Sequence, residues 1–572
     1  MNITGAIESE SLTQSSPSKL NNTGGSEVDD KLLDPSVDFV RRYHQRTKHC
    51  FEGYAKGPDT LDWDSQPNPF RHFDGCEKID LPLKTLEADL MYSELFSSDK
   101  PVAQHISLAT ISTFLRLSLG LSAWKQYGPD KWSLRVNPSS GNLHPTETYL
   151  AFPQTESGIE EGLYHYNVEQ HQLERRANGF SDSSAPEGFL LGFSSVLWRE
   201  AWKYGERSFR YSQLDVGHAI ATITSAAQAM GWQVEYLQSI TGSKLSAFLG
   251  LTREEYKCVE SEVPECLFHI RPLVRKEPLK PLKSLLPQAT SWFGRPSKLG
   301  GRTFYKWPIV DEIATMTECS SSNDGPLLTH GTGVERPSEP VPKLFSDVVF
   351  QRRSAQAYSK GSISTQQFKS IIEAVLFHSR SDFCQNLPNL HLVLMVHRVA
   401  SLSPGVYFIP SSSDREMWLE ESWHKWADLK PEPLFDFPSW NDIAGSKLYA
   451  LEFANVQKLA AVLSCQQAIA ADCAFTIGFL AEFNLSLEHS AGFAYREMHW
   501  HAGVLAQQVY QQATALDLAA TGIGCFFDDP CHKQLGINNT QLQLIYQVAV
   551  GKPIVDSRIT NFSGYHHLKR NL

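Results

Sequence analysis

The chain repeats itself at an offset of 286 residues, and this repeat constrains the fold more than any other feature of the sequence. A repeat of this length has the size of a whole domain and is far too long for a solenoid. The sequence therefore predicts two homologous copies on one polypeptide. Three pairs of segments align at this offset without a gap: Phe209-Arg210 with Tyr495-Arg496, Gly217 with Gly503, and Leu249-Gly250-Leu251 with Leu535-Gly536-Ile537.

We expect the two copies to pack as an intramolecular pseudo-dimer, so that the chain is a monomer. Fusion of a homodimeric ancestor lets two formerly identical interface sites change independently. Segments that bear functional groups in only one copy therefore mark the site that was retained. Upstream of the aligned block the offset falls to about 243 residues. The second copy thus carries an insertion, either a lid or a packing element, that contains Trp418, Trp423, Trp426 and Trp440.

Composition divides the chain into four parts. Residues 1–34 are polar and contain no apolar run, so we expect a disordered N-terminal tail and not a signal peptide. Prolines and serines crowd together over residues 276–340, which predicts an irregular linker long enough to wrap one domain around the other. The first domain is then expected at residues 35–275 and the second at residues 341–572.

Both copies alternate amphipathic helices with short apolar strands, which predicts an α+β fold with a central sheet. The most apolar stretch, residues 459–481, contains Gln466, Gln467 and Asp472, which are costly in lipid, so we expect a buried helix leading into a strand and no membrane span. The expected elements are helices at 105–120 and 213–230 with strands at 147–152, 163–168 and 189–198, then helices at 365–378 and 500–516 with strands at 391–397, 405–409, 473–479 and 543–550.

Charge and cysteine usage exclude several classes of function. The net charge of −11 provides no basic surface for nucleic acid. The ten cysteines form no C-x-x-C pair, which indicates reduced thiols in a cytoplasmic protein and not a disulfide framework. His499 and His501 have no further ligand at a suitable spacing, so we expect no metal site.

Paired arginines stand at the start of the second copy. Arg352 and Arg353 are followed by Ser354, and a helix is expected to open around Ser364. Guanidinium groups match phosphate oxygens bidentately, so this segment is a candidate anion cradle. The alternative is a solvated pair on the surface.

Two further segments differ between the copies in a way that suggests a ligand. Gly522 and Gly524 permit close backbone approach, whereas the first copy has Tyr236 and Gln238 at these positions, so the fold itself does not require the glycines. The first copy alone carries a loop in which a proline, two hydroxyls and a glycine precede a strand, formed by Pro138, Ser139, Ser140 and Gly141. A plain turn and drift of a loop are the alternatives.

These three segments, together with Lys203–Tyr211 and Asp215–His218, resemble motifs of the FMN-dependent nitroreductase superfamily. Within that superfamily the chain looks most like the branch of the azoline dehydrogenases, which form thiazoles and oxazoles, in a tandem duplication over roughly residues 36–560. The resemblance implies a nitroreductase-like α+β fold in which two wrapped units hold FMN at their interface.

The resemblance also assigns roles to residues. It implies that the phosphate is held by the second copy, the flavin ring is approached by its glycine turn, and the loop of the first copy covers the cofactor. The segment near Tyr92–Leu95 lacks paired arginines and the second copy lacks the serine-proline loop, so we expect one FMN per chain. The implied phosphate ligands are Arg352, Arg353, Ser354, Lys552 and Arg558, the ring contacts are Gly522, Gly524 and Phe526, and the cover is Pro138, Ser139, Ser140 and Gly141.

Lys203 and Tyr204 resemble the Lys-Tyr pair with which azoline dehydrogenases move protons as the flavin takes a hydride, and they are the expected catalytic residues. The second copy has His489-Ser490 there. The implied function is an oxidoreductase that transfers hydride through one FMN on a small molecule or modified peptide, with NAD(P)H as a candidate electron donor. Two alternatives stay open: a flavin-fragmenting or dehalogenating relative, and a non-catalytic FMN-binding interaction protein.

Overall fold

The computed structural model describes residues 34–84, 90–97, 101–179, 187–273, 289–300, 305–320, 326–328, 341–378, 381–429, 433–436 and 446–569. The tail expected at residues 1–34 lies outside them apart from Asp34, and so does Trp440. No described helix combines the length and the apolar character needed to cross a bilayer.

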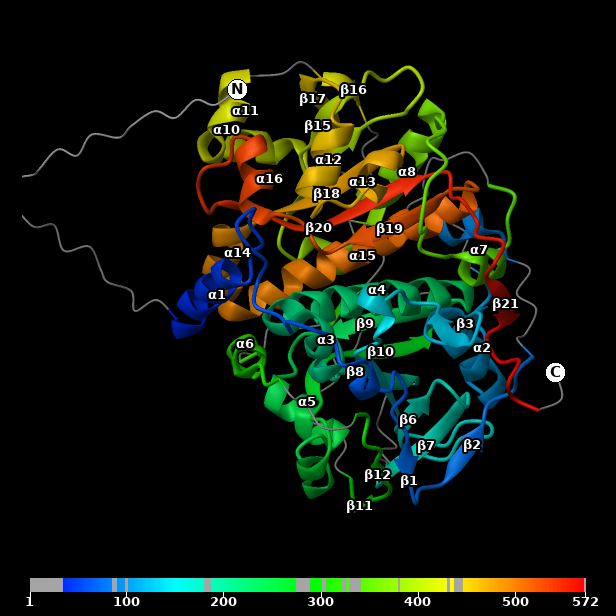
Figure 1. Ribbon diagram of the computed structural model, residues 1–572. Coiled ribbons are helices and arrows are strands. Elements are labelled where there is room, and N and C mark those ends of the chain that lie inside the picture. The colour runs from blue at the N-terminus through cyan, green and yellow to red at the C-terminus, as the bar shows by residue number, and fades with distance from the viewer. Residues whose placement is uncertain are drawn as a thin grey trace, which may run out of the picture.

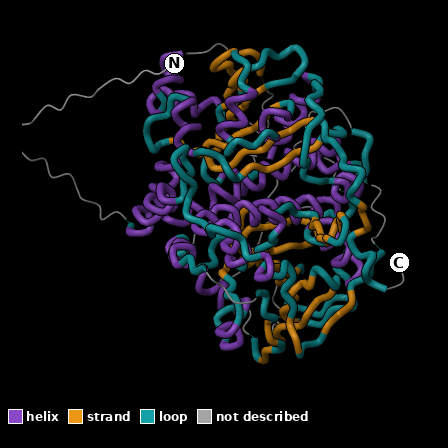
Figure 2. The backbone as a smooth tube through the Cα atoms, viewed as in Figure 1, coloured by secondary structure: helices purple, strands orange, loops and turns teal. Residues whose placement is uncertain are grey.

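Two long helices form the centre of the molecule. Helices α4 (Ser208–Ala229) and α15 (Ala494–Ala515) lie side by side between two sheets, and every residue in both helices is buried. A helix that is buried on all sides belongs to the interior of a large protein. Figure 2 shows this helical layer with strands above and below it.

The two sheets repeat one topology. In the first copy the order is β7-β6-β5-β8-β10-β9, and in the second it is β17-β15-β14-β18-β20-β19, with all of these neighbours antiparallel. This order confirms the expected duplicated α+β fold. The strands are β5 (Thr146–Phe152), β6 (Gly162–Asn167), β7 (Gln172–Asn178), β8 (Phe189–Ser195), β9 (Trp232–Leu237) and β10 (Val263–Pro272), and β14 (Leu390–Val396), β15 (Gly405–Ile409), β17 (Lys447–Phe453), β18 (Phe475–Glu482), β19 (Ala519–Ile523) and β20 (Leu542–Gly551).

Residues related by the sequence offset meet at the centre of the molecule. The rings of Phe209 and Tyr495 stack with centroids 6.4 Å apart and planes 5° apart. Gly217 and Gly503 face each other so closely that a Cβ built on either would lie 2.8 Å from the other's Cα. The pseudo-twofold axis of the duplication therefore passes between the two glycines.

Each copy also sends a segment onto the other. Helix α1 (Pro35–Arg46) packs on the second copy, where His44 Nε2 lies 3.1 Å from the Gln543 side chain. In return, β21 (Thr560–Ser563) of the second copy pairs antiparallel with β3 (Leu121–Tyr127) of the first. β3 also pairs with β4 (Asp130–Arg135). Two of the main hydrophobic clusters mix residues of both copies, so the copies share their cores.

The segment expected to be an irregular linker contains a helix, α6. The segment 276–340 was predicted to be irregular, but it contains α6 (Pro308–Met316), which packs beside α1. Arg210 and Arg496, which the offset relates, donate to the carbonyl of His44 in α1 and of Ala314 in α6 respectively. By this pairing α6 is the counterpart of α1 in the second copy.

The tryptophan insertion packs against the second sheet. Trp423 and Trp426 are buried, and Trp423 Nε1 donates to the Leu535 carbonyl at 2.8 Å. Trp423 lies between helices α10 (Glu416–Ser422) and α11 (His424–Leu429), and Trp426 lies in α11. Trp418, Trp423 and Trp426 belong to or pack on the cluster over this sheet, so the described tryptophans pack rather than form a lid.

The helices expected at 105–120, 213–230, 365–378 and 500–516 are α2 (Leu108–Ser118), α4, α8 (Thr365–His378) and α15, with shifts of a few residues at their ends. The strand expected at 189–198 stops at Ser195, because α3 begins at Leu197. The stretch 459–481 forms two short helices before β18. These two helices are α12 (Gln457–Leu463) and α13 (Ile469–Asp472). Further helices, which the sequence did not predict, are α3 (Leu197–Tyr204), α5 (Gly242–Leu249), α7 (Phe345–Gln351), α14 (Phe483–Ser490) and α16 (Asp528–Gln534).

A methyl group at the helix crossing should destabilise both copies together. In Gly503→Ala the new Cβ would lie 2.3 Å from the Leu214 carbonyl oxygen, a backbone atom that cannot move alone. We expect a loss of about 1–3 kcal/mol in unfolding free energy from overpacking, despite the better helix propensity of alanine. Urea unfolding measures this loss, with Gly53→Ala as the matched control because nothing lies within 4 Å of a Cβ there. Equal midpoints for the two variants would contradict the expectation.

Candidate functional site

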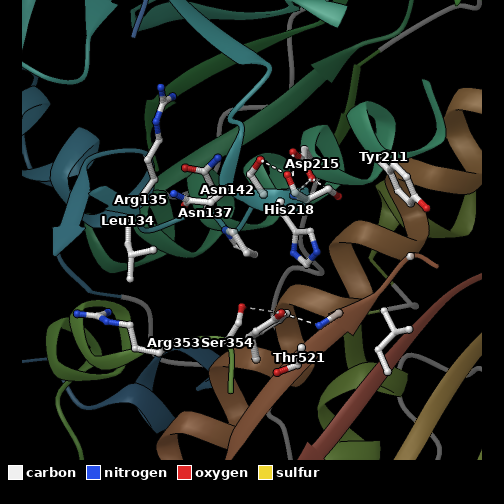
Figure 3. Close-up of a pocket in the computed structure, with 18 of the residues that line it drawn as sticks. Leu134, Arg135, Asn137, Asn142, Tyr211, Asp215, His218, Arg353, Ser354 and Thr521 are labelled. Carbon is white, nitrogen blue, oxygen red and sulfur yellow. Dashed lines mark hydrogen bonds between the residues drawn. The ribbon is translucent and has the colours of Figure 1, made fainter. Parts of the chain in front are cut away.

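A cavity of about 380 Å³ lies between the two copies and brings together most of the predicted residues. In Figure 3 the first copy's Asn137, Asp215 and His218 face Arg353 and Ser354 across it. The first copy contributes Lys125, Trp132, Leu134, Arg135, residues 137–142, His144, Tyr204, Tyr211, Asp215 and His218, and the second contributes residues 352–356, Gln467, Tyr510, residues 521–525 and Tyr546.

Four cationic residues line this cavity, Lys125, Arg135, Arg352 and Arg353, although the Arg135 guanidinium points away from it toward the carbonyls of Pro69 and Thr146. Arg352 crosses between the copies and donates to the carbonyls of Val136 and Arg135 at 3.1 and 3.0 Å. Arg353 donates only to the nearby carbonyls of Phe350 and Arg352. Within the described chain, none of the four forms a salt bridge.

Burial and mutual repulsion act against the positive charge of this cluster. Burial, and then the charge of Arg352, lower the pKa of Arg353 to about 10. Burial lowers the pKa of Lys125, and the charges of Arg353 and Arg352 lower it further. Cations held together without counterions at this depth are costly unless an anion joins them. The cluster is therefore suited to a phosphate.

A tyrosine joins the predicted arginine segment to the predicted glycine turn. The Tyr510 hydroxyl lies 3.0 Å from Ser354 Oγ and accepts the Gly522 N–H at 2.7 Å. The Arg352 guanidinium lies 5.4 Å from the centroid of the same ring. The two motifs, far apart in sequence, thus form one wall of the cavity.

Both glycines of the turn pack closely against tyrosine side chains. A Cβ at Gly522 would lie 1.8 Å from the Tyr546 hydroxyl, and one at Gly524 would lie 2.3 Å from the Tyr211 ring. Each glycine therefore allows an aromatic side chain to lie against the backbone. The glycine turn, Tyr211 and Tyr546 all line the cavity.

The serine-proline loop is held in an unusual conformation. Gly141, Asn142 and His144 all have positive φ, at 58°, 61° and 52°. Positive φ at two residues other than glycine is a strained arrangement that persists only when neighbours hold it. Asp215 provides one such hold, since its carboxylate accepts the Ser140 N–H at 3.0 Å.

The predicted catalytic pair packs on that loop. A Cβ at Gly141 would lie 2.6 Å from the Tyr204 hydroxyl and 3.1 Å from Lys203 Nζ. Tyr204 lines the cavity and also a second, outer cavity of about 370 Å³, which Lys203 lines as well. The two cavities share Tyr204, Tyr211 and Cys525.

Two buried carboxyl groups lie behind the loop. Burial raises the pKa of Asp215 to about 7. Burial, and then the nearby Asp215, raise the pKa of Glu200 well above its usual value. Neither Glu200 oxygen has a partner that meets strict hydrogen-bond geometry among the described residues, although Ser139 and Lys203 are neighbours. At neutral pH this pair holds at least one proton next to the cavity.

Three predicted cofactor ligands do not line the cavity. Arg558 is exposed and pairs with Asp556 at 2.7 Å. Lys552 is exposed, and its side chain lies against Gly361. Phe526 is fully buried under the Arg207 guanidinium, 5.0 Å from its ring centroid. After β20 the chain crosses to the first copy, where β21 pairs with β3, and this crossing carries Lys552 and Arg558 away from the cavity.

Several cavity residues were not assigned by the sequence. Lys125 and Arg135 lie on the β3–β4 hairpin, which carries no recognisable motif. Asp215 and His218 lie in a stretch that the family resemblance includes, but no role was assigned to them. Burial lowers the pKa of His218 to about 3, so its imidazole is neutral, with Nδ1 3.1 Å from the Gln507 side chain.

The symmetry-related position is filled by aromatic side chains. Tyr236, which stands opposite Gly522 in the repeat, packs edge-to-face on Trp500 and Phe383 with centroids 6.4 and 5.4 Å apart. The described cavity beside Tyr236 measures only about 10 Å³. The geometry therefore provides space for a ligand on one side of the pseudo-twofold axis.

Comparisons with known proteins agree with this architecture. A putative nitroreductase from Anabaena variabilis superimposes with a TM-score of 0.65 at 20% identity, covering 90% of this chain and 99% of that one, and shares the whole fold. The trifolitoxin-processing protein TfxB of Rhizobium leguminosarum bv. trifolii is 28% identical over 188 residues, 30% of this chain and 50% of TfxB. The putative nitroreductase MJ1384 of Methanocaldococcus jannaschii is 27% identical over 113 residues, 18% of this chain and 57% of MJ1384.

The chain spans about half the length of the two curated relatives it matches. The model of the nitroreductase family matches it twice, over residues 103–261 and 349–552, which together make up more than half of the chain. The two matched segments contain the arginine pair, the serine-proline loop and the glycine turn that meet at the cavity. The chain therefore belongs to the nitroreductase family, in a tandem form.

Proposed function

We propose that this chain is an FMN-dependent oxidoreductase with one flavin site, located in the cavity between its two copies. The observation that carries the proposal is the group of partly or fully buried cations, none of them in a salt bridge among the described residues, in a cavity lined by two close-packed glycines. The nitroreductase family generally consists of flavin oxidoreductases, which is consistent with this chemistry.

The cationic end fits the phosphate of FMN. Arg353, Arg352 and Lys125 would hold it by charge-assisted hydrogen bonds, and the Ser354 hydroxyl would add a further one. Lys552 and Arg558 are not part of this proposal, because neither side chain lines the cavity. Arg135 would contribute positive charge while its own donors stay with the carbonyls of Pro69 and Thr146.

The glycine wall fits the ring system. Gly522 and Gly524 bring backbone to the cavity from the second copy, and Pro138, Ser139, Ser140 and Gly141 close it from the first. FMN, when bound, supplies two-electron chemistry, while the protein supplies position and electrostatics. The chain's own residues must then handle the protons that accompany the electrons.

Lys203 and Tyr204 are positioned for proton transfer. Both contact the loop that closes the inner cavity, and both line the outer cavity, from which a substrate would approach. Burial raises the pKa of Tyr204 well above its usual value, so its phenol stays protonated and is a donor. Asp215, which lines the inner cavity, would act as a proton reservoir behind the loop.

The substrate class follows from the relatives and the outer cavity. TfxB is described as a toxin-processing protein, which supports a modified peptide or a small molecule as the substrate. NAD(P)H is the candidate electron donor. The outer cavity is bounded by His49, Tyr54, Gly57 and Pro58, so the substrate would enter beside the N-terminal segment of the first copy.

Flavin binding provides the primary test. The purified chain should bind about one FMN, lose its yellow colour with NAD(P)H, and regain it with a quinone or nitroaromatic acceptor. Arg353→Ala should weaken FMN binding by about 1.5–3 kcal/mol, roughly ten- to hundredfold, since it removes a charge-assisted phosphate contact. Fluorescence titration measures both affinities. Arg558→Ala is the matched control and should bind FMN like the natural chain.

Riboflavin separates a phosphate contact from a general loss of structure. It lacks the phosphate, so Arg353→Ala should leave riboflavin affinity unchanged. An equal loss for both flavins would contradict the assigned phosphate site, and two flavins per chain would contradict the single site.

The Lys203-Tyr204 pair should determine turnover and not cofactor content. Tyr204→Phe removes the phenol that donates a proton, and Lys203→Ala removes the neighbouring positive charge. For each variant we expect kcat to fall by about 10²–10⁴-fold, with an altered pH profile. The assay is NAD(P)H-driven reduction of a quinone by the FMN-loaded chain. His489→Ala, at the corresponding position of the second copy, is the control and should keep full activity. An unchanged pH profile in Tyr204→Phe would remove the residue from the proton path.

The buried Asp215 carboxyl should make stability depend on pH. Its pKa is raised to about 7 in the folded state, so its contribution is fully present below about pH 4 and is lost as the pH rises to about 7. Three pKa units correspond to up to about 4 kcal/mol. Compared with the natural chain, Asp215→Asn should lose less unfolding free energy between pH 4.5 and 7.5, as measured by urea unfolding. Asp64→Asn, on an exposed residue, should follow the natural chain, and identical curves for all three proteins would exclude the reservoir.

A further inference from the structure

Two cysteines 60 residues apart in sequence meet beside the cavity. The Phe527 N–H donates to the Leu463 carbonyl at 2.8 Å, and Gln467 Nε2 donates to the Cys525 carbonyl at 3.1 Å. These bonds tie the segment after the glycine turn to the turn that follows α12. Cys465 lies in the second segment and Cys525 in the first, so the two segments bring these cysteines next to each other, close enough for each to shift the pKa of the other.

The turn that carries Cys465 is strained. Cys465 and Gln466 have φ of 53° and 61°, two consecutive left-handed residues neither of which is glycine. Each such residue costs on the order of 1–3 kcal/mol and persists only where its surroundings hold it. The hydrogen bonds from Phe527 and Gln467 hold this turn against the segment that carries Cys525.

Cys525 lies in an environment that favours a thiolate. His49 lies close enough to Cys525 to lower the pKa of its thiol, and His49 Nδ1 accepts the Ala55 N–H at 2.8 Å, which leaves the other ring nitrogen as the donor. The hydrogen bond from Cys465, then those of His49 and the charge of Arg207, lower the pKa of Cys525 to about 5 despite burial. The same hydrogen bond raises the pKa of Cys465. The pair thus combines a nucleophile with a protonated partner.

Cys525 is also accessible. It lines the inner cavity and the outer cavity of about 370 Å³, so a small molecule in either can reach it. By contrast, Cys531 in α16 is fully buried, and burial raises the pKa of its thiol well above the usual range. Reactivity follows thiolate character and access, and Cys525 has both.

We propose that Cys525 and Cys465 are a redox-active pair that forms a reversible disulfide by exchange with a small-molecule disulfide entering the outer cavity. The Cys525 thiolate attacks one sulfur of RSSR, the S–S bond breaks, and RS⁻ leaves. Cys465 then loses its proton to that thiolate and attacks the Cys525 sulfur, releasing a second RS⁻, which takes a proton from water. The two cysteines lose two electrons, and RSSR is reduced to two thiols.

This pair is independent of the proposed flavin chemistry, but it adjoins the same wall. Cys525 directly follows Gly524, whose backbone lies against Tyr211 and lines the inner cavity. A disulfide to Cys465 would fix the end of this wall covalently. The exchange would therefore couple the thiol redox state of the surroundings to the geometry of the cavity.

Peptide mapping in glutathione buffers tests the exchange. The full chain is equilibrated with oxidised and reduced glutathione, quenched with acid and digested, and its disulfides are identified by mass spectrometry. We expect a Cys465–Cys525 cross-link that dithiothreitol removes. In Cys465→Ala the reaction should stop at a mixed disulfide of glutathione on Cys525, whereas Cys531→Ser should form the cross-link like the natural chain. Absence of the cross-link at every buffer ratio in the natural chain would overturn the proposal.

Alkylation kinetics supply a second measurement, which tests the natural chain directly and one variant beside it. The rate of iodoacetamide reaction at Cys525, followed by mapping, should be half-maximal near pH 5 in the natural chain. In Cys465→Ala it should move up toward the value of an ordinary thiol, about 8.5. A natural chain in which Cys525 reacts no faster at pH 6 than Cys531 would also overturn the proposal.

Discussion

The close crossing of α4 and α15 is the constraint on which the rest of the molecule depends. Gly217 and Gly503 let two backbones meet where a single methyl group would collide with a carbonyl oxygen. Because both helices are buried throughout, each belongs to the core of both copies. Helix α4 contributes Tyr211, Asp215 and His218 to the cavity and α15 contributes Tyr510, so a change in the distance between these helices would change the shape of the cavity. A large interface of this kind makes relative motion of the copies costly.

Duplication on one chain explains why the two sides of the axis differ. The first copy provides the strained loop and the Lys-Tyr pair, and the second provides the arginines and glycines. At the related position Tyr236 and Trp500 pack where a ligand would lie. In a homodimer, a glycine-to-tyrosine change at this position would have filled both sites. On a fused chain it fills one and adds buried aromatic surface, which stabilises the interface by roughly 25 cal/mol per Å² of apolar area.

The sequence repeat predicted which elements of the two copies correspond, because residues related by the offset, such as Phe209 and Tyr495, lie in contact at the pseudo-twofold axis. It also predicted the three motifs at the cavity, since their residue types differ between copies. It did not predict Lys125 and Arg135, because cations on a hairpin carry no signal of where they point. Lys552 and Arg558 were assigned by resemblance, but the exchange of β21 onto the first copy takes the chain elsewhere. Cys465 and Cys525 come together only through tertiary contacts that spacing cannot reveal.

The arrangement of the two cavities sets an order of events for any chemistry they support. The inner cavity is basic at one end and walled by backbone, which suits a resident nucleotide, whereas the outer one opens beside Tyr54 and Pro58 and suits a molecule that comes and goes. Tyr204, Tyr211 and Cys525 form the boundary between them. A substrate in the outer cavity would therefore meet a protonated phenol on one part of that boundary and a thiolate on another. Proton transfer and thiol exchange would then compete for the same approach, so the oxidation state of Cys525 would bear on which molecules the outer cavity admits.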